Sequence, residues 1–168
     1  MDYQIKLFSQ LDEELKKNWF IVEEDSCHTC FNSLAWIENY ISTYKETNSS
    51  VKLRIFVIFF KNEPVSIFPF EIVKKYQINV LQWVGDKKSD FNAPLQRKKF
   101  IFEKSMFKNA WCRILKMMPE IDIIYLKKQI NFFGITNNPF INFLKNVREG
   151  TIHQIFLPAK NITNCTFG

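Results

Sequence analysis

The sequence predicts one mixed α/β domain, in which a mostly antiparallel sheet carries helices on both faces. The chain has 168 residues, 46% of them hydrophobic and 24% charged, which suits a single globular domain. Apolar residues alternate in some segments and recur every three or four residues in others, so both strands and helices are expected. The segments follow the order β-α-α-β-β-β-α-β-α-β, and short connections between the middle strands favour antiparallel pairing. We expect the domain to span residues 1–160 and residues 161–168 to form a polar tail.

The first three predicted elements are a strand and two helices. Residues 3–8 alternate between polar and apolar side chains, as a half-buried strand does. Ser9 can cap a first helix, whose apolar residues recur at four-residue spacing. These are Leu11, Leu15 and Trp19. A second helix begins after Asn32-Ser33, and its apolar face consists of Leu34, Ile37, Ile41 and Tyr44.

Three consecutive strands are predicted at residues 51–60, 65–73 and 78–84. Residues 51–60 alternate at first and then become wholly apolar, which is typical of a strand that enters a core. Pro69 lies inside the second strand. Because proline has no backbone N–H, we expect an edge or a bulge there. Gly85 ends the third strand, and residues 85–97 form a long loop with few large apolar side chains.

The rest of the chain predicts a helix, a strand, a short helix and a last strand. The first of these helices has the most regular pattern in the sequence and ends at Pro119. Its apolar residues are Phe107, Ala110, Trp111, Ile114, Leu115 and Met118. Residues 121–126 predict a buried strand. Asn138-Pro139 can cap a helix with proline at its first position, and its apolar residues are Phe140, Phe143, Leu144 and Val147. Residues 152–157 predict the final strand.

Composition excludes several classes of function. The chain has only four glycines, and no two lie close together, so the glycine-rich loops G-x-G-x-x-G and G-x-x-x-x-G-K-[ST] are absent. The formal net charge of +6 raises nucleic acid or a membrane surface as partners. The basic residues are nineteen Lys and four Arg, spread as pairs along the chain, whereas base readout favours Arg. We therefore do not expect nucleic-acid binding, although a small basic nucleic-acid binder stays as a third hypothesis.

Cysteine and histidine give no strong site either. Cys27 and Cys30 form a single C-x-x-C in a linker between two helices, and a structural zinc site needs a second pair. We expect no metal. His28 and His153 have no Ser or Cys with an acid close in sequence, so nucleophilic catalysis is not expected. No apolar run has the length of a signal peptide or membrane span, and we expect a cytoplasmic protein without a membrane partner.

Between residues 31 and 95 the sequence resembles one branch of the GNAT acyltransferase superfamily. The branch is that of the CelD/BcsL-type (cellulose-biosynthesis-like) acetyltransferases, and the element order above is also that of the GNAT fold. The matching positions, in order, are Phe31, Ser33, Trp36, Ile67, Phe68, Pro69, Phe70, Gly85, Asp90, Phe91, Pro94 and Leu95. Proteins of this branch are usually about twice as long and contain two GNAT-like halves. The resemblance therefore implies that this chain is the N-terminal half.

The resemblance also implies acetyl-CoA or another acyl-CoA as cofactor, and here the chain departs from the pattern. A GNAT domain binds the pyrophosphate on backbone N–H groups, with the signature Gln/Arg-x-x-Gly-x-Gly/Ala, because the backbone must approach an anion closely. The corresponding segment here is GDKKSDFNAPLQRKKF, residues 85–100, with one glycine. Lysine side chains do not replace a nest of amides. We expect this chain alone not to bind acetyl-CoA in the standard way.

Five residues stand out as candidates. A general base on a GNAT sheet is often a glutamate, which makes Glu71 the candidate catalytic residue. Asp90 belongs to the family-like Asp-aromatic pair and, with Phe91 and Asn92, is a candidate for substrate binding. The alternative is that Asp90 caps a turn and that its neighbours anchor the loop. Asp86 is expected to be a turn residue.

These observations lead to two main hypotheses about function. The first is the N-terminal GNAT-like domain of a CoA-dependent N- or O-acyltransferase, inactive without a second half. Its partner would then be that second GNAT-like half or another copy of the chain. The alternative is a non-catalytic remnant or protein-interaction module that keeps the GNAT-like fold.

Overall fold

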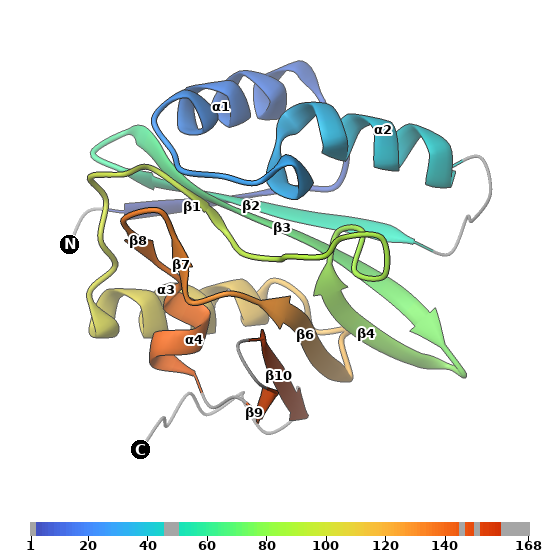
Figure 1. Cartoon of the computed structure of the whole chain (residues 1–168). Helices are drawn as coiled ribbons and strands as arrows, with labels where there is room; N and C mark the ends of the chain where they lie inside the picture. Colours follow the sequence, from blue (N-terminus) through green and yellow to red (C-terminus); the bar gives the residue numbers. More distant parts are fainter. Residues whose placement is uncertain (1–2, 46–50, 145–146, 150–151, 159–168) are drawn as a thin grey trace.

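The computed structural model describes residues 3–45, 51–144, 147–149 and 152–158. It confirms the predicted fold class. Helices α1 (Glu13–Glu24) and α2 (Leu34–Lys45) cover one face of a mixed sheet, and α3 (Lys104–Lys116) and α4 (Pro139–Phe143) lie on the other (Figure 1). The predicted tail at 161–168 lies outside the described residues. Among those residues, no helix is long and apolar enough to cross a membrane.

The main sheet has the strand order β1-β2-β3-β4-β6-β10-β9, and the short strand β5 also pairs with β3. All neighbouring strands are antiparallel except β4 and β6, which are parallel. The strands of this sheet are β1 (Tyr3–Phe8), β2 (Lys52–Phe60), β3 (Glu63–Lys75), β4 (Ile78–Trp83), β5 (Leu95–Gln96), β6 (Ile123–Gln129), β9 (Val147–Glu149) and β10 (Ile152–Pro158). A separate hairpin consists of β7 (Phe132–Phe133) and β8 (Thr136–Asn137), and a 3-10 turn, η1 (Cys30–Asn32), precedes α2.

Two predicted helix ends are wrong. Asp12, not Ser9, caps α1, because its carboxylate accepts a hydrogen bond from the Leu15 N–H at 2.8 Å. Helix α4 has the predicted Asn138 cap, which accepts from the Phe140 N–H at 3.0 Å. It nevertheless ends at Phe143, because the backbone becomes extended at Leu144, and Val147 pairs in β9 instead.

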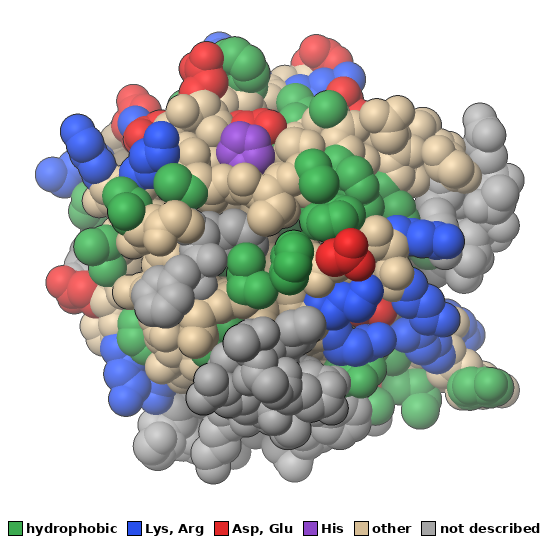
Figure 2. Space-filling view, in the orientation of Figure 1, with side chains coloured by type: hydrophobic (Ala, Val, Ile, Leu, Met, Phe, Trp, Pro, Cys, Tyr) green, Lys and Arg blue, Asp and Glu red, His purple; other side chains and the backbone are tan. Residues whose placement is uncertain are grey.

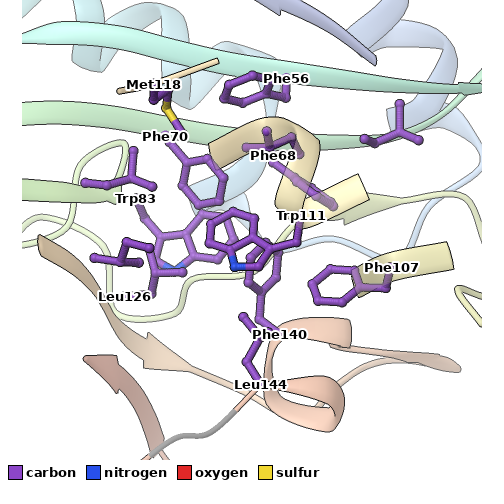
Figure 3. Packing of buried hydrophobic residues seen from close by; sticks show 14 of the residues in the cluster. Phe56, Phe68, Phe70, Trp83, Phe107, Trp111, Met118, Leu126, Phe140 and Leu144 are labelled. Atoms are coloured by element: carbon purple, nitrogen blue, oxygen red, sulfur yellow. The ribbon is translucent and has the colours of Figure 1, made fainter. Parts of the chain in front are cut away.

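The sheet separates two hydrophobic cores, because alternate residues of a strand point to opposite faces. On β2, Ile55 and Val57 face α1 and α2, whereas Phe56 faces α3. The core under α3 and α4 is rich in aromatic rings, and Phe140 lies among them (Figure 3). The two cores share one sheet, and the candidate site lies at a gap in that sheet between β4 and β6.

Candidate functional site

The candidate site lies where β4 and β6 separate. These two parallel strands pair only at Val80 with Ile123 and at Leu81 with Ile124. The expectation of an edge or a bulge at Pro69 is wrong, because Pro69 pairs in regular register with Ile55 of β2, and the register shift between β2 and β3 lies at Ile58 and Phe59. Strand β3 is an inner strand, not an edge, and it pairs with β4 from Phe70 onward and with β5 at Ser66 and Ile67. Pro69 lies near this change of partner, where the missing N–H of proline costs no ladder bond on that side.

The segment that follows β4 closes the sheet between β3 and β6. On one side, Leu95 and Gln96 pair with β3. On the other, the Asn92 N–H donates to the Lys128 carbonyl at 2.9 Å, and the Asn92 amide group donates to the Lys127 carbonyl at 3.2 Å. Figure 1 shows this segment in yellow-green, running from the end of β4 back along β3. The chain itself thus bonds to both strands that flank the gap.

The same segment is the one in which a GNAT domain would hold the pyrophosphate of acetyl-CoA. An anion site there needs backbone N–H groups that are free to donate. Here, many of these groups already donate to carbonyls of the chain at 2.6–3.1 Å. The donors include Asp86, Lys88, Ser89, Asn92, Arg97 and Lys98. The N–H groups of these residues are therefore not free to bind an anion.

Glu71, the candidate catalytic residue, lies in β3 beneath α2 and is fully buried. Its Oε1 accepts hydrogen bonds from the Gln82 side chain at 2.7 Å and from the Tyr40 hydroxyl at 3.3 Å. Its Oε2 is also buried and has no hydrogen-bond partner among the described residues. A buried carboxyl group with one unsatisfied oxygen is costly when it is charged.

Burial raises the pKa of Glu71 to about 7. The hydrogen bonds from Gln82 and Tyr40 and the nearby Gly85 backbone oppose this rise, whereas the neighbouring charge of Asp86 adds to it. A carboxyl group with a pKa near neutrality can accept and release a proton at physiological pH. The resemblance to the GNAT superfamily singled out Glu71, but its partners on β4 and α2 were not predicted.

Asp86 is a turn residue, as expected, but it is also fully buried. The Lys127 ammonium lies 3.2 Å from its Oδ2 and forms an ion pair with it. Lys75 lies nearby and donates to the Gln82 side chain at 3.1 Å. Burial lowers the pKa of Lys75. The charge of Asp86 opposes this change, whereas the charges of Lys127 and Lys87 add to it. The structure thus gathers acidic and basic groups around the end of β4, which the sequence did not predict.

The three candidates for substrate binding are not equivalent in the structure. Asp90 is exposed and Phe91 is 41% exposed, whereas Asn92 is buried against β6. The bonds of Asn92 to the carbonyls of β6 match the alternative hypothesis, that of a loop anchor. Asp90 and Phe91 remain available at the surface, and their role in binding stays a prediction.

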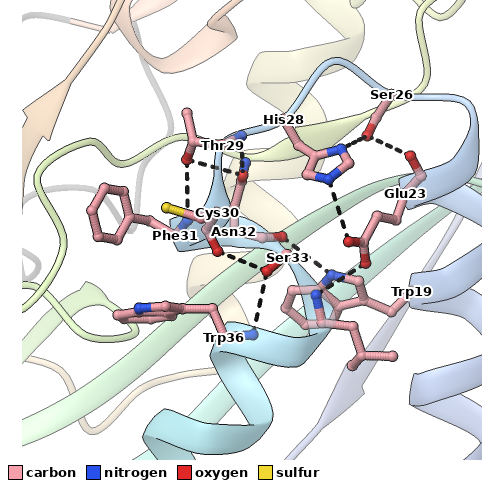
Figure 4. Close-up of polar contacts among 11 residues, drawn as sticks. Trp19, Glu23, Ser26, His28, Thr29, Cys30, Phe31, Asn32, Ser33 and Trp36 are labelled. Carbon is pink, nitrogen blue, oxygen red and sulfur yellow. Dashed lines mark hydrogen bonds and ion pairs between the residues drawn. The ribbon is translucent and has the colours of Figure 1, made fainter.

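A second polar cluster, which the sequence did not predict, joins α1 to α2 through the linker (Figure 4). The His28 ring lies 3.1 Å from the Ser26 hydroxyl and 3.4 Å from the Glu23 carboxylate. The other carboxylate oxygen of Glu23 accepts from the Leu34 N–H at the start of α2. The Ser26 hydroxyl donates to the Glu23 carbonyl at 2.9 Å. Because the Ser26 hydroxyl proton already bonds to the Glu23 carbonyl, we interpret the cluster as a cap between two helices, not as an activated nucleophile.

The C-x-x-C motif contributes no site that the structure shows. Cys27 and Cys30 both have free thiols, and Cys30 begins the 3-10 turn η1. Cys27 packs against Gly134 of the β7–β8 turn. Within the described part of the chain, no group of three or more His, Cys, Asp or Glu side chains could hold a metal ion.

Comparison with solved structures identifies the fold. No family model and no curated protein matches the sequence. The structure is similar to that of an N-acetyltransferase from Staphylococcus aureus Mu50, with a TM-score of 0.54 and 10% identity over 96% of this chain and 100% of that one. It is also similar to PH1933 from Pyrococcus horikoshii OT3, with a TM-score of 0.52 and 14% identity over 94% of this chain and 98% of that one. The chain therefore has the GNAT acetyltransferase fold. At this level of identity, the similarity concerns the fold alone.

Proposed function

We propose that this chain is a GNAT-like domain of a CoA-dependent N- or O-acyltransferase and that it does not hold the acyl donor by itself. The observation that carries the proposal is the segment after β4. Several of its backbone N–H groups donate to carbonyls of the chain, and it pairs with both β3 and β6. The fold supports acyl transfer as the reaction class, whereas this segment argues against donor binding by the chain alone.

Within that reaction we propose Glu71 as the group that accepts the proton of the acceptor amine or hydroxyl. Its pKa of about 7 suits proton transfer near neutral pH. Gly85 and Trp36 lie over this region, since a side chain added at Gly85 would collide with the Trp36 ring. An acceptor would therefore reach Glu71 only when the segment around Gly85 moves.

We further propose that the donor contacts come from a second GNAT-like half, as the resemblance to the CelD/BcsL-type branch implies. That half could be another domain or a second copy of the chain. Each solved structure named above is matched over nearly its whole length, so the similarity covers one whole GNAT domain. The proposal of a second half rests on the closed segment and on the sequence resemblance.

A second candidate function is a non-catalytic module that keeps the fold. The observation that favours it is the burial of Glu71, because a base with no exposed surface cannot meet an acceptor without rearrangement. In this case, no second half would exist. Asp90 and Phe91 would then have no role in catalysis.

Thermal unfolding with and without acetyl-CoA tests the proposal. Ligand that binds only the folded state raises the melting temperature, so we expect no shift for this chain. A single-domain acetyltransferase that binds acetyl-CoA should show a clear rise under the same conditions and serves as the control. A clear rise for this chain would contradict the proposal.

A neighbouring reading frame distinguishes the acyltransferase hypothesis from the hypothesis of a non-catalytic module. If a frame next to this gene encodes a GNAT-like half, we expect the two products together to release CoA from acetyl-CoA in the presence of amine acceptors. Neither product alone should do so, and Glu71→Gln should abolish the joint activity. Absence of activity in the pair would favour the non-catalytic module.

A further inference from the structure

A groove between α1 and α2 is a feature of the described chain that the acyl-transfer proposal does not use. It has a volume of about 530 Å³, in the range of ligand-binding clefts. Phe20, Leu34 and Ala35 give it an apolar lining, and Glu24, Glu38 and His28 contribute polar groups. Phe20 is 57% exposed, and a large aromatic side chain at such a position is typical of a binding anchor. We call this feature the α1–α2 groove.

The groove is held open by the polar cluster in the linker. Glu23 contacts His28 through one carboxylate oxygen and the first N–H of α2 through the other. These contacts fix the end of α1 relative to the start of α2 (Figure 4). A preformed groove binds a partner with less ordering cost than a flexible one.

The groove lies in an acidic part of an otherwise basic protein. Residues 12–44 contain seven acidic and two basic residues, so this segment carries −5 and the rest of the chain +11. Figure 2 shows acidic side chains next to the histidine over α1 and α2, with some basic side chains among them, and a further group of lysine and arginine side chains near the end of β4. A negative patch of this kind attracts a positively charged partner and suppresses others.

The acidic residues at the end of α1 are also badly placed for helix stability. Glu23 and Glu24 end the helix and Asp25 caps it, without a basic residue in the last turn. The carbonyl end of a helix carries partial negative charge, so carboxylates there are unfavourable. Asp25 is compensated by Arg97 at 2.9 Å and Glu23 by the linker contacts. Glu24 has no ion pair with any described residue, so fold stability does not explain why a glutamate occupies this position.

We propose that the α1–α2 groove binds a basic amphipathic segment of a protein partner. An apolar side chain of the segment would pack against Phe20 and Leu34. Its lysine or arginine side chains would face Glu24 and would compete for Glu38 with Lys16, whose ammonium lies 3.1 Å from the Glu38 carboxylate. Charge complementarity selects this occupant, because the groove combines an apolar lining with an acidic rim in a chain that is otherwise basic. The proposal is independent of acyl transfer.

Fluorescence anisotropy with a labelled lysine–leucine amphipathic peptide tests the proposal on the full chain. We expect saturable binding that weakens with salt. Phe20→Ala should weaken it about tenfold or more, as the loss of an interface anchor does. Glu24→Lys should weaken it about fivefold or more at low salt. A glutamate–leucine peptide should not bind.

Glu24→Lys also separates a binding role from a structural one. Because it removes an unfavourable charge at the helix end, we expect it to raise the melting temperature while it weakens peptide binding. Glu103→Lys makes the same charge change at an exposed residue before α3, on the other face of the sheet, and should leave peptide binding within about twofold of the wild type. Equal weakening by both lysine variants would overturn the proposal, and so would unchanged binding by Phe20→Ala. Complete displacement of the peptide by spermidine at equal charge would also overturn it, in favour of a free amine ligand.

Discussion

Glu71 couples the stability of the fold to pH. Its pKa is about 7 in the folded chain, against 4.5 for an ordinary glutamate, because burial disfavours the charged carboxylate. The folded state therefore binds more protons than the unfolded state between these two values. Stability from this group is fully present below pH 4.5 and is lost as pH rises through 7. The shift corresponds to about 3 kcal/mol.

Glu71→Gln removes this dependence. We expect the variant to be more stable than the wild type at pH 8, where the buried carboxylate is charged, by an amount on the order of 1–3 kcal/mol. At pH 5 the difference should be small, because the protonated acid and the amide are nearly isosteric. Urea unfolding at several pH values measures the stability difference between the variant and the wild type at both pH 8 and pH 5. Asp90→Asn, at an exposed carboxyl, should show no such trend, and a parallel pH profile for Glu71→Gln and the wild type would contradict the assignment.

At the residue scale, the sequence predicted candidate residues but not the residues that they contact. Glu71 could be named because a general base on a GNAT sheet is often a glutamate, and Asp86 because it follows a glycine that ends a strand. Their burial and contacts depend on Tyr40, Gln82 and Lys127, which are distant in sequence. The Glu23–Ser26–His28 cluster was missed for another reason. A helix that ends at Glu24 brings the three together, and the sequence did not fix that end.

At the scale of elements, the two tight hairpins have strained backbone in their turns. Lys61-Asn62 joins β2 to β3, and Tyr76-Gln77 joins β3 to β4. All four residues have positive φ, at 49–70°, which costs a residue with a side chain roughly 1 kcal/mol or more. Two-residue turns of this kind favour Asn-Gly, because both positions then adopt the left-handed region readily. Tyr76 is fully exposed, so it offers no packing in return.

The double variant Tyr76→Asn/Gln77→Gly should therefore stabilise the fold by about 1 kcal/mol. Chemical denaturation measures the difference, and the denaturant dependence should stay unchanged. Tyr76→Ser removes the ring without supplying the turn preference, so it should have little effect. Destabilisation by the double variant would mean that the exposed ring or the native turn has a role that these contacts do not show.

At the element scale, patterns predicted which elements exist but not how they end or pair. Regular apolar spacing identified α3, and the Asn138-Pro139 signal identified the start of α4. Strand β5 was missed because two residues, Leu95 and Gln96, are too short to show a period. Strand β4 pairs with β3 only from Phe70 onward. The part of β3 before Pro69 therefore needs another partner on that side, and β5 supplies it. That pairing is non-local and closes the candidate site.

The whole molecule is one sheet with a core on each face, and Phe140 joins four elements of the larger core. It lies in a helix of five residues, yet its ring contacts side chains of β3, β4 and α3. The distances between ring centroids are 5.0 Å to Phe68, 5.8 Å to Phe70, 5.3 Å to Trp83, 5.0 Å to Phe107 and 5.1 Å to Trp111. These residues are distant in sequence, and only the fold shows that their rings meet around one short helix.

Phe140→Ala should destabilise the whole domain, not only α4. Loss of a fully buried aromatic side chain costs about 3–5 kcal/mol, and the central ring has edge-to-face contacts that add to this cost. Because β2 and β3 contribute residues to both cores, we expect unfolding to stay a single transition, with circular dichroism and tryptophan fluorescence coinciding. Trp19→Phe, in the core under α1 and α2, should shift the same transition. Phe20→Ala, at an exposed ring, should change stability by no more than about 0.5 kcal/mol. If Phe140→Ala abolishes folding, Phe140→Leu gives the graded measurement. Separate transitions for the two probes would show that the sheet does not couple its two faces.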